Sequence, residues 1–203
     1  MSSKTKRTLL FLIWLFIILS GPVSVVQNQP SLLKFFQRTA GLLGFSFLFI
    51  QIVLGALMKK WIEFFGSKIF KFHVTQGILG YGFVLIHLLF QYLVLFSFSG
   101  FANFWKFTNP WINLGRVAFI FLTVGVLAAY FRAKPVFQRN WRLFHIFNYF
   151  VFFLVAIHAG KIGTDVKTFP FSFVYRLTIT LVALTILYRF VWLKLKSRDN
   201  IKI

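Results

Sequence analysis

The chain has no cysteine and only three acidic residues, Glu63, Asp165 and Asp199, among its 203 residues. The absence of cysteine excludes structural disulfides, cysteine-held iron–sulfur clusters and thiol chemistry within the chain. None of the three carboxylates falls clearly within an apolar run, which argues against a carboxylate proton relay or a cation transporter. By contrast, the chain has 23 Lys and Arg, 31 Phe and 59% hydrophobic residues, a composition that excludes an ordinary soluble domain.

A formal net charge of +20 raises the question of nucleic-acid binding. The basic residues form no basic face or nucleic-acid-binding motif, so we expect no nucleic-acid partner. They lie mainly between long apolar runs, a distribution typical of membrane proteins. The composition therefore predicts contact with membrane lipid and a location in the cell membrane.

Six apolar stretches are long enough to cross about 30 Å of hydrocarbon. They cover residues 8–26, 39–58, 72–97, 112–131, 142–162 and 172–193. We expect an all-α membrane protein, a six-transmembrane-helix bundle that forms a single domain over residues 1–203. Gly21-Pro22 and Pro30 are expected to loosen or end the first helix.

The distribution of Lys and Arg predicts the orientation of the bundle. If the N-terminus, the loops near 59–71 and 132–142, and the C-terminal end share one side, that side holds 16 of the 23 Lys and Arg. An excess of Lys and Arg marks the cytoplasmic side, so both termini should be cytoplasmic. The first apolar run follows Lys4, Lys6 and Arg7 without a small-residue cleavage site, which indicates a retained helix rather than a cleaved signal peptide.

The four histidines form two pairs, His73 with His87 in the third span and His145 with His158 in the fifth. Separations of 14 and 13 residues correspond to about 21 Å and 19.5 Å of helix rise, so the pairs match in depth. Histidine is costly in hydrocarbon, and a neutral imidazole is a ready metal ligand. We therefore predict two b-type haems, with iron held by His73 and His145 near the inner side and by His87 and His158 toward the outer side.

The rotation of an ideal helix is a stricter test of this arrangement. His73 and His87 are about 40° apart around the helix axis and share a face, whereas His145 and His158 are about 140° apart. Either the fifth span is locally overwound, or the two macrocycles approach it from different sides. The sequence leaves both possibilities open.

Other residues near the histidines are candidates for contact with the macrocycles. The candidate partners of the haem propionates are Lys71 and Arg142 beside the inner pair, and Arg38, Arg116 and Lys161 near the outer pair. Arginine binds a carboxylate through two parallel hydrogen bonds, so Arg38 is favoured, although each cation could instead snorkel or set orientation. Gly77 and Gly80 share the histidine face of the third span, where they either make room for a macrocycle or pack against another helix. Asn148, one turn from His145, could bond to a ligand or tie helices together.

The chain resembles the ferric reductase-like transmembrane domain family in two segments, Lys71-Phe72-His73-Val74-Thr75-Gln76-Gly77 through His87-Leu88-Leu89, and Trp141-Arg142-Leu143-Phe144-His145 through Ile157-His158. That family includes ferric reductases, NADPH oxidases and the bacterial haem-binding subunit of the periplasmic methionine sulfoxide reductase system. The resemblance covers roughly residues 8–193. It implies a six-helix bundle with paired histidines on the third and fifth spans at the spacing found here, so the family accommodates the rotation described above.

The resemblance is divided between two branches of the family. The run Phe36-Gln37-Arg38-Thr39-Ala40 and the lack of appended domains are similar to the methionine sulfoxide reductase subunit, which however tends to carry arginine at the position of His73. The presence of all four histidines is more similar to the ferric reductase and oxidase branch. Those proteins usually continue into FAD- and NAD(P)H-binding domains, and no Gly-rich dinucleotide motif occurs here. The electrons would therefore come from a separate flavoprotein reductase, a loosely bound flavin, or a quinol or quinone.

The expected function is a di-haem b transmembrane electron-transfer protein, ferric reductase-like, that passes electrons from a cytoplasmic-side or membrane donor to an acceptor at the outer face. That acceptor could be a ferric chelate, oxygen or a periplasmic protein. The alternative within the family is electron delivery to a periplasmic methionine sulfoxide reductase. The rival from another class is a non-redox membrane transporter or assembly protein with structural histidines. In either branch, the chain would be an oxidoreductase or an electron-transfer subunit of one.

Overall fold

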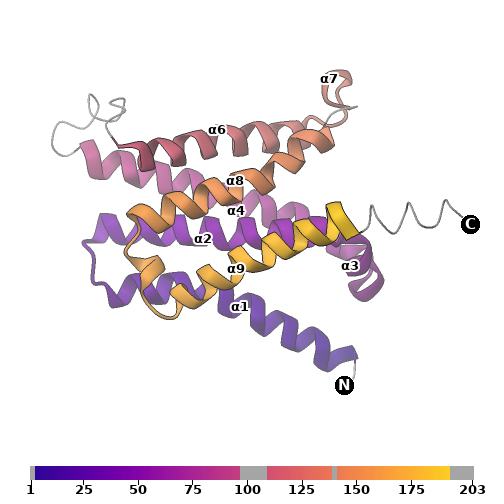
Figure 1. Cartoon of the computed structure of the whole chain (residues 1–203), viewed down its shortest axis with the longest axis horizontal. Coiled ribbons are helices and arrows are strands. Elements are labelled where there is room, and N and C mark those ends of the chain that lie inside the picture. Colours follow the sequence, from indigo (N-terminus) through magenta and orange to yellow (C-terminus); the bar gives the residue numbers. More distant parts are fainter. Residues whose placement is uncertain (1–2, 97–108, 139–140, 193–203) are drawn as a thin grey trace, which may run out of the picture.

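The computed structural model describes residues 3–96, 109–138 and 141–192, and within these ranges the chain is helical without strands (Figure 1). The long helices are α1 (Ser3–Gln27), α2 (Leu32–Ala56), α4 (Lys68–Phe96), α6 (Pro110–Tyr130), α8 (Trp141–Ile162) and α9 (Phe171–Ile186). A π-helical segment, η2 (Leu187–Trp192), continues α9. In the described ranges, the connections contain two short helices and a 3-10 turn, namely α3 (Met58–Phe65), α7 (Pro135–Gln138) and η1 (Asp165–Lys167).

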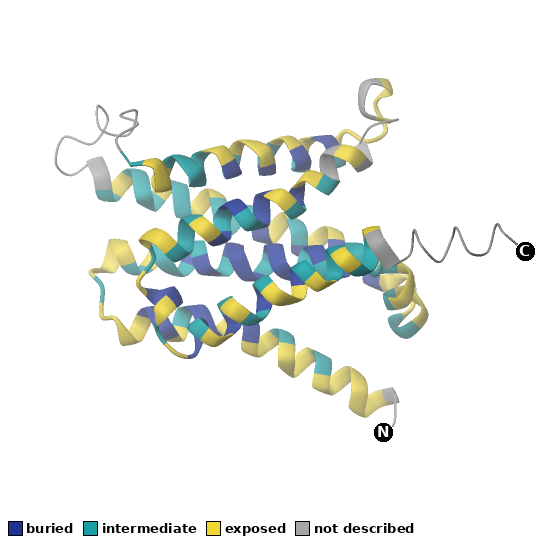
Figure 2. Cartoon of the chain, in the orientation of Figure 1, coloured by how far each residue is buried: buried dark blue, intermediate teal, exposed yellow. Residues whose placement is uncertain are grey.

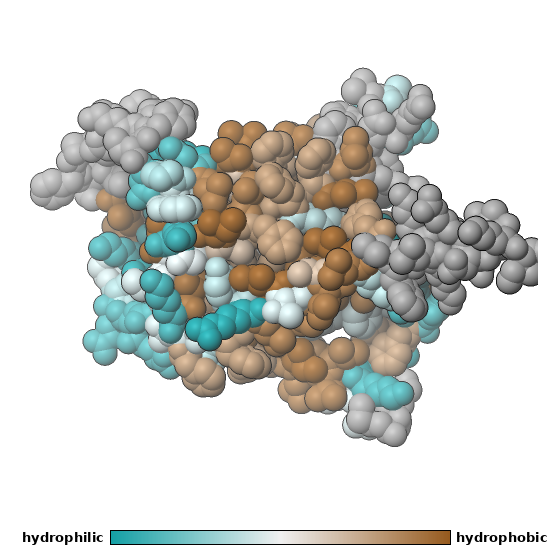
Figure 3. Space-filling view, in the orientation of Figure 1, coloured by the Kyte–Doolittle hydropathy of each residue, from teal (hydrophilic) through white to brown (hydrophobic). Residues whose placement is uncertain are grey.

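Five helices in the described ranges are long and apolar enough to cross a membrane, namely α1, α2, α4, α6 and α9 with its extension. The described apolar part of α8, Ile146–Ile162, is shorter. Large apolar side chains such as Ile78, Ile120 and Leu184 are more than half exposed, which suits contact with lipid. Figure 3 shows hydrophobic side chains across the middle of the visible face and hydrophilic ones gathered at the end where α1 meets α2. The prediction of an all-α chain with several membrane-length helices is confirmed.

Several helices begin earlier than the apolar runs predicted. α2 begins at Leu32 rather than near residue 39, and α4 begins at Lys68 rather than near residue 72. Lys and Arg are good helix formers, so a helix can extend past the apolar residues that mark its span. Pro22 was expected to loosen or end the first helix, but α1 continues through it to Gln27. Membrane helices tolerate proline where neighbouring groups satisfy the freed backbone positions.

α2 is the central helix of the molecule and carries the largest share of its buried residues (Figure 2). It packs most extensively against α4, and it also contacts α1, α8 and α9. Glycines allow the close approach of α2 and α4: a Cβ on Gly80 would lie 2.8 Å from the Cβ of Phe47, and a Cβ on Gly44 would lie 2.9 Å from Val84 Cγ2. Close packing of small residues is the main means by which helices associate in lipid.

The second extensive helix pair is α6 with α8. The two pairs are joined on one side by Tyr81 of α4, whose hydroxyl lies 3.0 Å from Thr123 Oγ1 and whose ring stacks on Phe119 at 6.4 Å. Elsewhere in the described part of the chain, α4 makes no extensive contact with α6 or α8. This arrangement leaves space in the bundle between the α2–α4 pair and the α6–α8 pair.

Candidate functional site

Two cavities occupy the space between the two helix pairs. The His73 cavity has a volume of about 430 Å³ and is lined by His73 and Asn148, among others. The His87 cavity has a volume of about 480 Å³ and is lined by both His87 and His158. Both volumes lie in the range of roughly 300–1,000 Å³ that is usual for ligand sites. Four residues line both cavities, which are therefore stacked end to end: Gly44, Leu48, Val84 and Leu122.

In the His87 cavity, both imidazoles bond to main-chain carbonyls. Nδ1 of His87 lies 2.8 Å from the carbonyl oxygen of Gln37, and Nδ1 of His158 lies 2.7 Å from that of Trp111. A carbonyl oxygen can only accept, so Nδ1 of each ring carries the proton and donates it. Nε2 of each ring is then unprotonated, with a lone pair suited to bind a metal. The cavity thus holds two imidazoles, from α4 and α8, in the tautomer that a metal site requires.

His73 has a different environment. It is buried, and its Nε2 lies 3.1 Å from the side-chain amide nitrogen of Gln51. The side-chain oxygens of Gln51, Gln76 and Asn148 are buried without a hydrogen-bond partner. Unsatisfied buried oxygens are costly, so this part of the bundle is suited to receive a hydrogen-bond donor. His145, the predicted partner of His73, belongs to α8, but its side chain lies outside the described residues, as does that of Arg142.

The cationic candidates are distributed unevenly around the cavities. Arg38 and Arg116 line the His87 cavity, as their positions in the sequence suggested. Lys71, however, is exposed and does not line the His73 cavity. Lys71 precedes His73 by two positions, and two residues correspond to about 200° of helix rotation, so the two side chains point away from each other. Lys161 lies over the Trp111 ring, 4.9 Å from its centroid.

The His73 cavity is lined instead by two arginines that the sequence did not indicate, Arg132 and Arg189. The guanidinium of Arg189 donates to the Gly55 carbonyl at 3.2 Å and lies 3.5 Å from the Tyr149 hydroxyl. Arg189 lies in η2, far from His73 in sequence, so spacing along the chain carried no signal for it. Arg116 bonds to Asn113 Oδ1 at 2.8 Å, which directs its guanidinium along α6.

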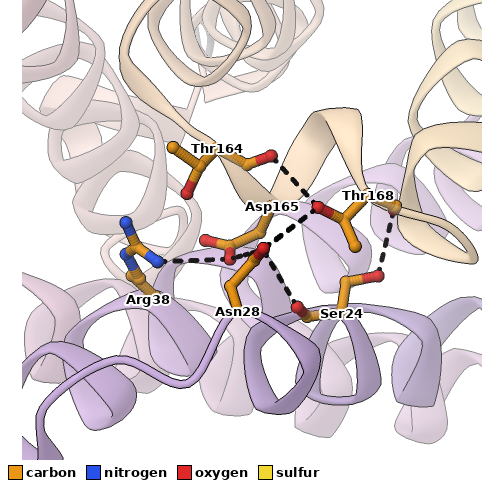
Figure 4. A network of polar contacts seen from close by, with 6 residues as sticks. All are labelled: Ser24, Asn28, Arg38, Thr164, Asp165 and Thr168. Carbon is orange, nitrogen blue, oxygen red and sulfur yellow. Dashed lines mark hydrogen bonds and ion pairs between the residues drawn. The ribbon is translucent and has the colours of Figure 1, made fainter.

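Arg38 belongs to a polar network that joins α1, α2 and η1 (Figure 4). Asp165, only 3% exposed, accepts a hydrogen bond of 2.7 Å from Asn28 and lies 3.4 Å from the Arg38 guanidinium. Asn28 also donates to the Ser24 carbonyl at 3.1 Å, and the Ser24 hydroxyl donates to the Thr168 carbonyl at 3.1 Å. Asp165 thus balances the charge of Arg38 at the wall of the His87 cavity. The sequence placed Asp165 outside the spans but carried no sign that it is buried.

Gly77 and Gly80 both line the His73 cavity, and both also face α2. A Cβ on Gly77 would lie 2.7 Å from the side-chain nitrogen of Gln51, and one on Gly80 would lie 2.8 Å from Phe47 Cβ. Gly80 therefore serves the packing of α4 on α2, whereas a substitution at Gly77 would displace the side chain that bonds to His73.

No protein-family model, curated protein or solved structure matches the chain. Among the side chains that the structure describes, no group of three or more His, Asp or Glu converges as a site for a bare metal ion. The described histidines line the two cavities instead: His87 and His158 line one, and His73 lines the other. Two histidines beside one cavity suit a metal that is already held in the plane of a macrocycle.

Proposed function

We propose that the chain is a membrane protein that binds two b-type haems and carries electrons across the bilayer, as its resemblance to ferric reductase-like transmembrane domains implies. The observation that carries this proposal is the pair of stacked cavities between the helix pairs, one lined by His73 and the other by His87 and His158. Paired histidines at two depths are what two axially ligated haems require. A structural role for the histidines would not call for cavities beside them.

The residues of the His87 cavity fit a haem. His87 and His158 each have Nε2 available for iron, because Nδ1 of each donates to a carbonyl. Arg116 lines the same cavity and could bind a propionate, whereas the charge of Arg38, which also lines it, is partly balanced by Asp165. In the His73 cavity, we propose that His73 and His145 would hold the iron, with Arg132 and Arg189 as the cations that line the cavity.

When bound, two such haems supply one-electron transfer from a cytoplasmic-side or membrane donor to an acceptor at the outer face. Two axial histidines leave iron no vacant position, which favours outer-sphere transfer over activation of a bound ligand. We propose a flavoprotein reductase or a quinol as donor, and a ferric chelate, oxygen or a periplasmic protein as acceptor. Co-purification with a periplasmic methionine sulfoxide reductase would assign the chain to that branch, and co-purification with a soluble flavoprotein would assign it to the ferric reductase branch.

We further propose that α8 is the sixth span and that both termini are cytoplasmic in the cell membrane. The start of α1 and the short helices α3 and α7 lie at the same end of the molecule (Figure 1). Lys59 and Lys60 lie in α3, and Arg132 and Lys134 lie just before α7. This concentration of basic residues at one end supports the orientation, because Lys and Arg accumulate on the cytoplasmic side.

A reduced-minus-oxidised visible spectrum of the purified protein tests the proposal. We expect sharp low-spin b-haem bands, and the substitution His87→Ala should remove the signal of one haem. Lys71→Ala is the matched control, because Lys71 also lies on α4 but lines neither of these two cavities. A colourless preparation from haem-replete cells would overturn the proposal in favour of a non-redox membrane protein with structural histidines.

A further inference from the structure

The three histidines with described side chains share one structural feature. Each imidazole lies against a glycine of a neighbouring helix and bonds to the residue four positions before that glycine. The sets are His87 with Gly41 and Gln37, His158 with Gly115 and Trp111, and His73 with Gly55 and Gln51. Gly41 and Gly55 are separated in α2 by the same number of residues as His73 and His87 in α4. A single antiparallel register of the two helices therefore places His87 against Gly41 and His73 against Gly55.

Helix geometry explains why a glycine is needed four residues after the bonded carbonyl. A helical carbonyl already accepts the N–H of the residue four positions later, but it has a second lone pair. The Cβ of that later residue tilts toward the helix N-terminus and therefore covers the carbonyl. With glycine at that position, a side chain from another helix can reach the second lone pair.

The distances at Gly41 and Gly115 support this explanation. A Cβ on Gly41 would lie 2.8 Å from Nδ1 of His87, and a Cβ on Gly115 would lie 2.6 Å from Cε1 of His158. Neither distance is compatible with the observed position of the ring. An alanine at either glycine would thus push the imidazole away from the carbonyl that fixes its tautomer.

His73 makes a different hydrogen bond, although its glycine also lies four positions after the residue that the ring bonds to. A Cβ on Gly55 would lie 3.4 Å from His73 Cε1, at the edge of ordinary contact. The side-chain amide nitrogen of Gln51 bonds to Nε2 of this ring, whereas in His87 and His158 the bonded atom is Nδ1. An amide nitrogen can only donate, so it engages the Nε2 lone pair. Iron coordination through Nε2 of His73 would require Gln51 to move away first.

We infer that the two cavities are unequal: Gly41 and Gly115 are positioning residues that hold His87 and His158 ready to bind iron, whereas Gln51 competes with iron for His73. The His87 cavity consequently binds haem first and more tightly, and the His73 cavity fills second. This inference rests on the proposed function, because it concerns the same two haem sites.

Titration of the full-length chain with haem, after purification from cells depleted of haem, tests the inference. We expect two steps in the visible spectrum, the first abolished by His87→Ala and the second by His73→Ala. Gly41→Ala and Gly115→Ala should raise the Kd of the first step at least tenfold and alter the low-spin electron paramagnetic resonance signal of that haem. Gly82→Ala is the matched control on α4, because a Cβ there meets nothing within 4 Å.

Gln51→Leu provides an independent test that does not depend on a glycine variant folding. Removal of the amide donor should lower the Kd of the second step severalfold and leave the first step unchanged. A first step assigned to the His73 cavity, two haems bound with equal affinity, or equal effects of Gly41→Ala and Gly82→Ala would overturn the inference while leaving the proposed function intact. A wild-type chain that binds no haem would overturn the proposed function itself.

Discussion

Replacement of Asp165 by alanine should destabilise the protein at the junction of α1, α2 and η1. The carboxylate is buried, with 3% of the residue exposed, and it meets Asn28 at 2.7 Å and Arg38 at 3.4 Å. In Asp165→Ala, the Asn28 amide loses an acceptor and the Arg38 guanidinium loses the carboxylate that faces it. The substitution therefore combines a lost charge-assisted hydrogen bond with an uncompensated, partly buried cation.

The magnitude follows from the two contacts. A hydrogen bond to a charged group contributes about 1.5–3 kcal/mol. The Arg38 contact contributes less, about 0.2–1 kcal/mol, because the arginine side chain is 29% exposed and water screens it. Asn28 keeps its bonds to the Ser24 carbonyl and the Thr168 hydroxyl, which limits the loss. We expect the free energy of unfolding to fall by about 2–3 kcal/mol.

Thermal unfolding of the purified protein in detergent, followed by the loss of helical circular dichroism, measures this effect. Glu63→Ala is the matched control, because Glu63 is an exposed acid on α3, and its removal should change stability by less than about 0.5 kcal/mol. In the double variant Arg38→Ala with Asp165→Ala, the loss should be smaller than the sum of the two single losses. If Asp165→Ala is as stable as Glu63→Ala, the network does not hold α1, α2 and η1 together.

Three further predictions concern the cavities and the helix contacts around them. His87→Ala and His158→Ala should each remove the same single haem, so the double variant should lose no more than either alone by visible spectroscopy; loss of two haems in the double variant would contradict a shared site. Gly80→Ala should destabilise the α2–α4 pair by about 1–3 kcal/mol, because its Cβ would meet Phe47 Cβ at 2.8 Å, while Gly82→Ala should be neutral in the same denaturation assay. Tyr81→Phe should cost about 0.5–1.5 kcal/mol through loss of its bond to Thr123, and a stability equal to wild type would show that this hydroxyl pair does not join α4 to α6.

The helical class and the approximate positions of the long helices could be predicted from the sequence, because apolar runs of span length have few other structural solutions. The helix starts could not, since the first turns of α2 and α4 carry Lys, Arg and Gln that favour helix without being apolar. α3 was missed for the same reason: Lys59, Lys60 and Glu63 interrupt its apolar residues, and it is too short to span a membrane.

The sequence singled out the histidines of the candidate site but carried little signal for the groups around them. His87 and His158 line one cavity, and their shared ligation of a haem stays a prediction. The bonded carbonyls of Gln37 and Trp111 are main-chain groups, which residue types do not reveal. Gly41 had one detectable signal, the repeat of Gln-x-x-x-Gly at Gln37 and Gln51 with the spacing of the α4 histidines. The repeat indicates contacts with the histidines only once the register of α2 on α4 is known.

The central claim is that two haems are held between the α2–α4 and α6–α8 helix pairs. The most direct test is the number of haems per chain in the purified protein, obtained from a pyridine haemochrome assay and an independent protein determination. The account predicts two b-type haems per wild-type chain and one in each of the variants His73→Ala and His87→Ala. A wild-type chain without haem, or a haem content that neither substitution changes, would contradict it.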